Sequence, residues 1–359
     1  MSIFRLFLCF IFVFAPICVF GGDIFDKLGE QAVHDALAGG IVIFVEKNGR
    51  IVHHGAYGTA SRDSVFDLAS LTKIYATTLA LMKLTDDGLL DPADKISKFF
   101  PEYTENGKAE VTIEHLLRHT SGLPAWLPMY CTNLPLLEIP LENKAGASRK
   151  YSDIGFMILG RLIEKVSGVS LAEYVQKNIY KPMELTSTGF KPNNTENIMP
   201  TYFGGFEANM IKNKAACTPT EKRLLKGEVN DGNARLAFDG IAGHAGLFSN
   251  AADLARLTKL IADGGQGYIK KETIDRFLTK DEFGQAMGFA LTADSLHADK
   301  VTPQTFGHLG FTGTSFVYVP EQKLTVIILT NRQINGLDEK GRYPYLKPLR
   351  RAVLRNALD

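Results

Sequence analysis

The feature that most constrains the fold of this chain is the position of its two β-rich regions, which lie near opposite ends of the sequence. Residues 40–59 hold an apolar run, a Lys47-Asn48-Gly49 turn signal and a second apolar run, which is the pattern of a β-hairpin. Residues 314–329 hold two further β-rich runs, separated by Pro320-Glu321-Gln322-Lys323. We therefore predict one antiparallel sheet built from both termini, with the rest of the chain inserted between its strands.

The chain between these hairpins has a mainly helical pattern of apolar residues. Candidate helices span about residues 70–87, 112–119, 153–167, 171–178 and 251–263, with a further amphipathic one at 345–357. We expect an α/β (α+β) fold in one domain over residues 23–359, with the sheet from about 40–60 and 285–359 and the helical region over about 68–265. Residues 191–240 are predicted to be a long loop beside the seam between sheet and helices, where an active site would lie.

The N-terminus carries a targeting pattern. Residues 6–20 are wholly apolar, follow Arg5 and end where polar sequence begins. This run is short for a transmembrane helix and is typical of a secretory signal peptide, which we place at residues 1–22. The alternative is an uncleaved N-terminal membrane anchor. Both interpretations predict a secreted or periplasmic protein of the cell envelope.

Charge and cysteine spacing exclude several classes of function. The formal net charge is +1 and there is no long basic run, so the sequence gives no support for a nucleic-acid partner. Outside the predicted signal peptide, Cys131 and Cys217 could form a disulfide or stay as buried thiols, and neither has the spacing of a metal ligand. Glycine-rich phosphate loops are also missing from the sequence. We predict no metal and no cofactor.

A candidate nucleophile stands at the start of the first long predicted helix. Ser70 and Lys73 are three residues apart, so they share one helix face and the lysine can reach the serine Oγ. A serine hydroxyl is a poor nucleophile until a base takes its proton, and a lysine in a suitable environment can be that base. The alternative interpretation is a helix-capping serine followed by a solvated lysine.

Five segments in order resemble a known superfamily. They are Ser70-Leu71-Thr72-Lys73, LLRHTSGLP at 116–124, Tyr151-Ser152-Asp153, GHAGLFSNAADLARL at 243–257 and FGHLGFTGTS at 306–315. Their order and spacing are similar to those of the serine β-lactamase and penicillin-binding protein superfamily, and most of all to class C β-lactamase-like serine hydrolases. The resemblance runs from about residue 25 to the C-terminus and implies a β-lactamase/transpeptidase-like fold.

The resemblance also implies catalytic roles. Ser70 would be the nucleophile that forms an acyl-enzyme, with Lys73 on the next helical turn. Tyr151 matches the tyrosine of the family's Tyr-x-Asn motif. A phenolate is favoured beside a cation, so either Lys73 or Tyr151 could take the serine proton, and the sequence leaves both open.

Two departures from the family pattern bear on the substrate. Asp153 stands where asparagine is usual. Its carboxylate can only accept hydrogen bonds, and its charge favours a protonated Lys73. Asp153 would therefore either disfavour β-lactam turnover or pair with Lys73 and hold the site together. His308 stands where the family usually has the lysine of Lys-Thr-Gly. Because a histidine gains charge only in mild acid, we expect weaker or pH-dependent recognition of a substrate carboxylate.

Further substrate-binding residues follow from the same motifs. Gly310 would let the backbone approach the ligand closely, and an N–H near Thr314 or Ser315 would complete an oxyanion hole with the N–H of Ser70. A loop containing Asp231 and Asn233, followed by His244, resembles one from a peptidoglycan-linked branch of the family. These three side chains could meet over the cleft and recognise the substrate. The alternative for this loop is local turn formation.

The segment from His119 to Gly122 is interpreted as structural, as a helix end with a glycine cap. The combined prediction is a metal-independent serine hydrolase of the cell envelope that acts through an acyl-enzyme. Its substrate would be a small molecule or, by family analogy, a cell-wall peptide containing D-amino acids. The alternatives are an esterase or a true β-lactamase on the same residues and, from another class, a non-catalytic binding or scaffold protein with this fold. The oligomeric state is not determined by the sequence.

Overall fold

The computed structural model describes residues 23–105, 107–211 and 222–359. The predicted signal peptide, residues 1–22, lies outside the described residues. Within the described ranges, none of the helices combines the length and apolar character that a bilayer crossing requires. Cys131 is disulfide-bonded, and the other cysteines of the sequence are not among the described residues.

The structure has strands at both ends of the chain and helices mostly between them. The strands are β1 (Gly40–Lys47), β2 (Arg50–Gly58), β3 (Phe66–Asp67), β4 (Gly189–Phe190), β5 (Thr201–Phe203), β6 (Arg223–Leu225), β7 (Leu247–Ser249), β8 (Phe306–Leu309), β9 (Ser315–Val319) and β10 (Leu324–Thr330). The α-helices are α1 (Ile24–His34), α2 (Leu79–Asp86), α3 (Ile113–Leu117), α4 (Asp153–Ser167), α5 (Leu171–Val175), α6 (Phe206–Met210), α7 (Gly232–Ala237), α8 (Ala251–Ala262), α9 (Lys271–Leu278) and α10 (Lys347–Leu358).

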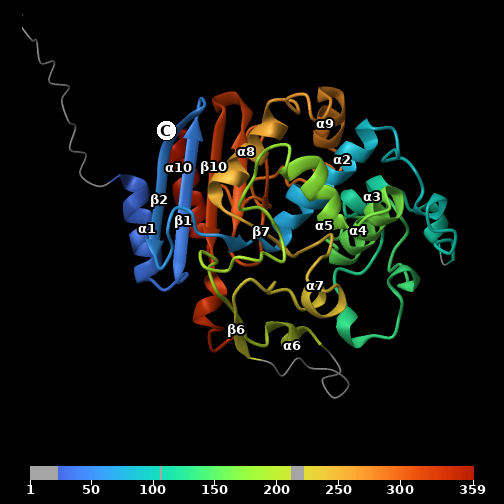
Figure 1. Ribbon diagram of the computed structural model, residues 1–359, viewed down its shortest axis with the longest axis horizontal. Coiled ribbons are helices and arrows are strands. Elements are labelled where there is room, and N and C mark those ends of the chain that lie inside the picture. Colours follow the sequence, from blue (N-terminus) through green and yellow to red (C-terminus); the bar gives the residue numbers. More distant parts are fainter. Residues whose placement is uncertain (1–22, 106, 212–221) are drawn as a thin grey trace, which may run out of the picture.

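The main sheet joins the two ends of the chain. Its strand order is β2-β1-β10-β9-β8, and all neighbouring strands are antiparallel. The central pair is β1 with β10, in a register that sets Ile41 opposite Thr330 and Lys47 opposite Leu324. Helices α1 and α10 pack beside β2 and β10, while the helical region fills the other side (Figure 1). The predicted antiparallel sheet from both termini is therefore confirmed.

Both faces of this sheet are buried, which explains the unbroken apolar run of β1. Val42 and Phe44 belong to the large core under the helical region. Ile41, Ile43 and Val45 alternate with them and belong to a second core formed with α1 and α10. Because successive side chains of a strand point to opposite faces, a strand buried on both faces reads as continuously hydrophobic rather than alternating.

The helix that carries the candidate nucleophile is not a regular α-helix throughout. It begins with a 3₁₀ turn at Ala69–Leu71, continues as a π-helical segment at Lys73–Thr78, and becomes α2 only at Leu79. Ala69 has a φ of 47°, a strained value for a residue with a Cβ. Apolar periodicity predicts a helix here but does not distinguish these variants. Such irregular turns are frequent at functional sites.

The region predicted as a long loop, residues 191–240, contains the short elements β5, β6, α6 and α7. In the view of Figure 1, α6, β6 and α7 lie together along the lower rim of the molecule. The N-terminus of α7 is capped by Asp231, whose Oδ1 accepts from the Ala234 N–H at 2.8 Å. These elements are too short to produce a recognisable period in the sequence.

Candidate active site

Ser70 and Lys73 form a direct contact at the start of the nucleophile helix. Lys73 Nζ donates a hydrogen bond to Ser70 Oγ at 2.9 Å. The lysine side chain is completely buried. A solvated lysine, which was the alternative interpretation of this motif, does not occur here. The lysine side chain instead lies inside the protein, and its amine points to the Ser70 hydroxyl.

Two more acceptors complete the surroundings of the Lys73 amine. Its Nζ donates to the backbone carbonyl of His244 at 3.1 Å and forms an ion pair with Asp153 Oδ1 at 2.7 Å. The amine thus donates two hydrogen bonds, to Ser70 Oγ and the His244 carbonyl, while its contact with Asp153 is an ion pair. Burial opposes the charge on Lys73, but the Asp153 carboxylate and Tyr151 outweigh it and raise the pKa of Lys73 on balance. The resting group is therefore an ammonium.

Tyr151 lies against the same amine. Its ring centroid is 5.0 Å from Lys73 Nζ, and both Lys73 and Ser70 act on its hydroxyl to favour the phenolate. Burial is the largest influence and raises the pKa of Tyr151, which Asp153 raises further, although Lys73 acts in the opposite direction. The resting group is a neutral phenol. Thus neither of the two residues proposed as the base is deprotonated before substrate binds.

His119, interpreted above as structural, holds Tyr151 in place. Its Nδ1 accepts from the Ser152 N–H at 3.1 Å and its carbonyl accepts from the Lys150 N–H at 2.9 Å. The ring lies 4.4 Å from the Tyr151 ring, centroid to centroid. Burial and the Lys73 charge place the pKa of His119 well below its ordinary value, so Nδ1 remains an acceptor. The sequence signal for this role was the position of the histidine at the end of the predicted helix 112–119.

His308 approaches the site from the edge strand β8. Its Nδ1 lies 2.9 Å from the Leu309 carbonyl, which can only accept, so Nδ1 carries the proton. The ring centroid is 6.1 Å from that of Tyr151. Burial, followed by the charge of Lys73, lowers the pKa of His308 to about 3. The expectation that His308 gains charge in mild acid is therefore wrong, because the surrounding protein disfavours the imidazolium.

Gly310 allows β8 to lie against the segment that leads to Ser70. A Cβ at this position would come within 2.0 Å of Thr314 Oγ1 and 2.6 Å of the Leu68 carbonyl oxygen. The close approach that we expected is thus made to the protein's own backbone. Thr314 Oγ1 donates to the same Leu68 carbonyl at 3.0 Å.

The oxyanion donor predicted near Thr314 or Ser315 does not fit their position. Ser315 starts β9, an interior strand, and pairs with both Leu309 of β8 and Ile328 of β10. Thr314 is fully buried. The prediction is wrong for Ser315 because the backbone of an interior strand pairs with its neighbours, and for Thr314 because this residue is buried away from an incoming substrate. Among the described residues, no hydrogen bond uses the N–H of Phe311, which follows Gly310 beyond the end of β8.

Asp231 and His244 meet, whereas Asn233 is used elsewhere. His244 Nε2 lies 2.9 Å from Asp231 Oδ1, and the backbone carbonyl of the same histidine accepts from Lys73. Burial raises the pKa of Asp231, but His244 and neighbouring donors lower it on balance. Asn233 is fully buried; its Oδ1 accepts from the Met129 N–H at 2.7 Å and its Nδ2 donates to the Leu127 carbonyl at 2.8 Å. The prediction that Asn233 binds substrate is wrong, since its amide fastens the 127–129 segment.

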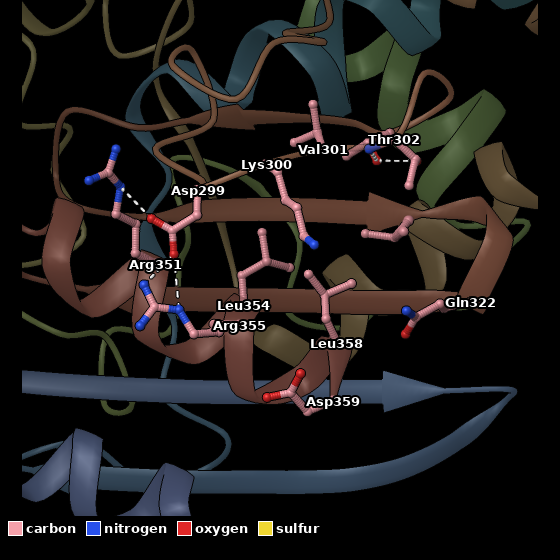
Figure 2. Close-up of a pocket in the computed structure, with 12 residues that line it drawn as sticks. Asp299, Lys300, Val301, Thr302, Gln322, Arg351, Leu354, Arg355, Leu358 and Asp359 are labelled. Atoms are coloured by element: carbon pink, nitrogen blue, oxygen red, sulfur yellow. Dashed lines mark hydrogen bonds and ion pairs between the residues drawn. The ribbon is translucent and has the colours of Figure 1, made fainter.

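A cavity of about 670 Å³ lies on the other side of the main sheet, along α10. In its charged lining, Asp299 contacts both Arg351 and Arg355 (Figure 2). None of the predicted site residues lines it. Within the described part of the chain, no group of three or more histidine, cysteine or acidic side chains is arranged to hold a metal ion.

This chain is similar to known proteins over most of its length. The family model described as Beta-lactamase matches residues 25–349. An N-acetylmuramyl-L-alanine amidase from Bacillus subtilis is 30% identical, with 86% of this chain and 80% of the relative covered. A putative D-alanyl-D-alanine carboxypeptidase from Escherichia coli is 32% identical, with 84% and 80% covered. The structure of EstCE1, a hydrolase with promiscuous acyltransferase activity, superimposes with a TM-score of 0.71 at 22% identity and covers 93% of this chain and 97% of its own.

The chain belongs to the β-lactamase family and has the fold of the class C β-lactamase-like and penicillin-binding enzymes. It is a serine hydrolase. The expected family and fold are thereby confirmed.

Proposed function

We propose that this enzyme cleaves amide bonds of cell-wall peptides containing D-amino acids, through an acyl-enzyme on Ser70. The observation that carries the proposal is the 2.9 Å contact between Lys73 Nζ and Ser70 Oγ in a buried site that also holds the Tyr151 hydroxyl. The substrate class is supported by two relatives, one named an N-acetylmuramyl-L-alanine amidase and the other a putative D-alanyl-D-alanine carboxypeptidase.

Acylation must begin with a proton shift, because Lys73 is an ammonium and Tyr151 a phenol at rest. Asp153 Oδ1, 2.7 Å from Lys73 Nζ, is in place to take one ammonium proton. This transfer turns the ion pair into an amine and a carboxylic acid, a change favoured when substrate excludes water from the site. The amine, directly or through Tyr151, then accepts the proton of Ser70 Oγ.

The serine oxygen next forms a bond to the substrate carbonyl carbon, and the carbonyl π electrons move to its oxygen. The N–H groups of Ser70 and Phe311 are the candidate donors to this oxyanion. Collapse of the intermediate breaks the carbon–nitrogen bond, and the leaving amine takes up the proton from the Lys73 and Tyr151 pair. Water then attacks the acyl carbon and gives a proton to the same pair. The bond between the acyl carbon and Ser70 Oγ breaks, and the pair returns the proton to Ser70 Oγ.

An esterase or a true β-lactamase would use the same residues. The Asp153 carboxylate supports an amide or ester substrate rather than a β-lactam, because it replaces a side chain that can donate by one that only accepts when ionised. We place the enzyme in the secreted or periplasmic compartment. The apolar N-terminal run and the disulfide at Cys131 support this, since disulfides persist in oxidising surroundings.

The first experiment measures hydrolysis of a small activated ester by the wild type, by Ser70→Ala and by the control Ser61→Ala, which removes an exposed hydroxyl. We expect Ser70→Ala to lower kcat by about 10³-fold or more, as loss of a nucleophile does, and Ser61→Ala to have little effect. Intact-mass analysis after addition of benzylpenicillin then shows whether an adduct forms on the wild type alone. Unchanged ester turnover by Ser70→Ala would rule out the assigned nucleophile.

A further inference from the structure

The turn before Ser70 contains a buried carboxylate that the proposed mechanism does not use. Asp67 ends strand β3, three residues before the nucleophile, and is only 2% exposed. Its Oδ1 accepts from the Ala69 N–H at 2.9 Å, and its Oδ2 accepts from the Asn230 N–H at 2.7 Å. The two oxygens of one carboxylate therefore join the nucleophile turn to a residue 163 positions away in the sequence.

We propose that Asp67 is a positioning residue, which holds Ser70 in its reactive place and ties it to the pair formed by Asp231 and His244. This inference rests on the proposed function, because it takes Ser70 as the attacking group. It deepens that function by identifying what fixes the nucleophile relative to the rest of the site. Asp67 acts through backbone groups on both of its sides.

The first hydrogen bond stabilises a strained residue next to the nucleophile. Ala69 has a φ of 47°, in the left-handed region that a residue with a Cβ rarely adopts. It begins the 3₁₀ turn that carries Ser70. An aspartate oxygen that accepts from the N–H two residues further on forms an Asx turn, which favours such a change of chain direction. The Asp67 carboxylate therefore fixes the direction in which the chain enters Ser70.

The second hydrogen bond reaches the other side of the site. Asn230 directly precedes Asp231, whose Oδ1 lies 2.9 Å from His244 Nε2. The His244 carbonyl in turn accepts from Lys73 Nζ at 3.1 Å. Asp67 is thus connected to the nucleophile along the backbone and to the lysine through this series of contacts. Release of the carboxylate would allow the two halves of the site to move apart.

The backbone of Asp67 fixes a third segment of the site. Its carbonyl accepts from Thr312 Oγ1 at 2.7 Å, and Thr312 is buried. Thr312 directly follows Phe311, whose N–H is the candidate donor to the oxyanion. The nucleophile, the surroundings of the lysine and the candidate oxyanion donor are therefore all held by one residue.

The ionised carboxylate is the form of Asp67 that fits these contacts. Burial raises the pKa of Asp67 to about 6, whereas the N–H groups of Asn230 and Ala69 lower it, since they bind the charged form. Asp67 is therefore ionised at neutral pH, and both hydrogen bonds are charge-assisted. An asparagine in its place has one acceptor oxygen for two N–H donors, and its own NH₂ group would face the second donor.

The test compares Asp67→Asn with Asp253→Asn in hydrolysis of the small activated ester. Asp253 is a matched control, because it is also a buried aspartate, and its Oδ2 accepts from the Ser187 N–H and from Thr188 Oγ1, both at 2.9 Å. We expect Asp67→Asn to lower kcat by about 10- to 100-fold, as displacement of a reacting group or loss of a charge-assisted hydrogen bond does. KM should change by less than about threefold, since the ester is bound by other groups.

Unfolding in urea separates positioning from a general loss of stability. Asp67→Asn and Asp253→Asn should both unfold at a lower urea concentration than the wild type, because each leaves a buried donor without its acceptor. Only Asp67→Asn should lose turnover, and Asp253→Asn should keep the kcat and KM of the wild type. A role of Asp67 in stability alone would leave kcat unchanged in both folded variants.

Two further variants test the contacts from the partner side. Ala69→Gly should raise the kcat of Asp67→Asn by at least about threefold, because glycine adopts a positive φ without strain from a Cβ. Thr312→Val removes the donor to the Asp67 carbonyl and should lower kcat by about 3- to 10-fold at a nearly constant KM, as loss of a neutral hydrogen bond predicts. The second variant decides the question if Asp67→Asn does not fold.

The inference is overturned if folded Asp67→Asn keeps the kcat of the wild type, or if Asp253→Asn loses as much kcat at the same loss of stability. It is also overturned if Ala69→Gly restores no activity to Asp67→Asn or if Thr312→Val leaves kcat unchanged. These results leave the proposed function intact as long as ester hydrolysis depends on Ser70. Loss of that dependence would instead refute the proposed function.

Discussion

Asp153 is the neighbour that most strongly favours the protonated form of Lys73. The Asp153 carboxylate, 2.7 Å from Lys73 Nζ, raises the pKa of the amine although burial alone would lower it. It also raises the pKa of Tyr151. The proton that must leave Ser70 therefore has no free acceptor until one of these groups is deprotonated. We infer that Asp153 sets the pH range in which the enzyme can be acylated.

Replacement of Asp153 by asparagine should shift the pH dependence of the reaction. Loss of the negative charge lowers the pKa of both Lys73 and Tyr151, so the base form becomes available at lower pH. We expect the rising limb of kcat/KM against pH to move to lower pH by about 1 unit or more in Asp153→Asn. Ester hydrolysis measured from pH 5 to 10 checks this, with Glu339→Gln, an exposed site, as the control. A limb that stays in place or moves to higher pH would contradict it.

At the scale of elements, the site depends on how closely β8 approaches the start of the nucleophile helix. Gly310 permits this approach, because any Cβ would meet Thr314 Oγ1 at 2.0 Å and the Leu68 carbonyl oxygen at 2.6 Å. The Leu68 oxygen belongs to the backbone that positions Ser70, so it cannot move without moving the nucleophile. The glycine is therefore required by the packing of two elements that lie far apart in sequence.

Gly310→Ala should consequently harm both stability and catalysis. Forcing a methyl group into this contact should cost about 1–3 kcal/mol of unfolding free energy, as overpacking usually does, and should lower kcat by displacing Ser70. Urea unfolding and ester hydrolysis measure the two effects. Gly189→Ala is the matched control, because the nearest atom to its Cβ would be 3.9 Å away. Equal unfolding free energies and equal kcat values for the two variants would show that Gly310 is not in close contact with the backbone that leads to Ser70.

For the whole molecule, burial of neutral histidines makes stability depend on pH. The pKa of His308 is lowered to about 3 in the folded protein, mainly by burial, from its ordinary value of 6.5. Between these values the unfolded chain binds a proton that the folded protein does not. The stability due to the neutral His308 is thus present above pH 6.5 and is lost as pH falls toward 3. Asp67 opposes this trend, because burial raises its pKa to about 6.

Removal of His308 isolates its part of this effect. From pH 6 to 4, the unfolding free energy of the wild type should fall more steeply than that of His308→Gln. The difference in slope should reach up to about 1.4 kcal/mol per pH unit, which corresponds to the uptake of one proton on unfolding. Chemical unfolding at several pH values measures both slopes. Parallel curves for the two proteins would show that His308 is not a buried neutral group.

The local pattern of residues in the sequence was sufficient to predict much of the fold and the pair Ser70 and Lys73 at the centre of the site. Apolar runs and turn residues indicate the strands near both termini, and the spacing of Ser70 and Lys73 places them on one helix face. These features depend on residues that are close in sequence, so a single chain reveals them. The short elements within 191–240 and the π-helical turn escaped prediction, because neither has a period of its own.

Tertiary structure decided what surrounds that centre. The contact of Lys73 with the His244 carbonyl joins residues 171 positions apart, and the neutrality of His308 depends on burial among several elements. Ser315 was misjudged because only strand order shows that β9 is interior, and Thr314 because only the tertiary structure shows its burial. The reason is the same in each case: desolvation and hydrogen-bond partners are set by the relative placement of distant segments, whereas the sequence by itself determines local conformation and the identity of the reactive groups.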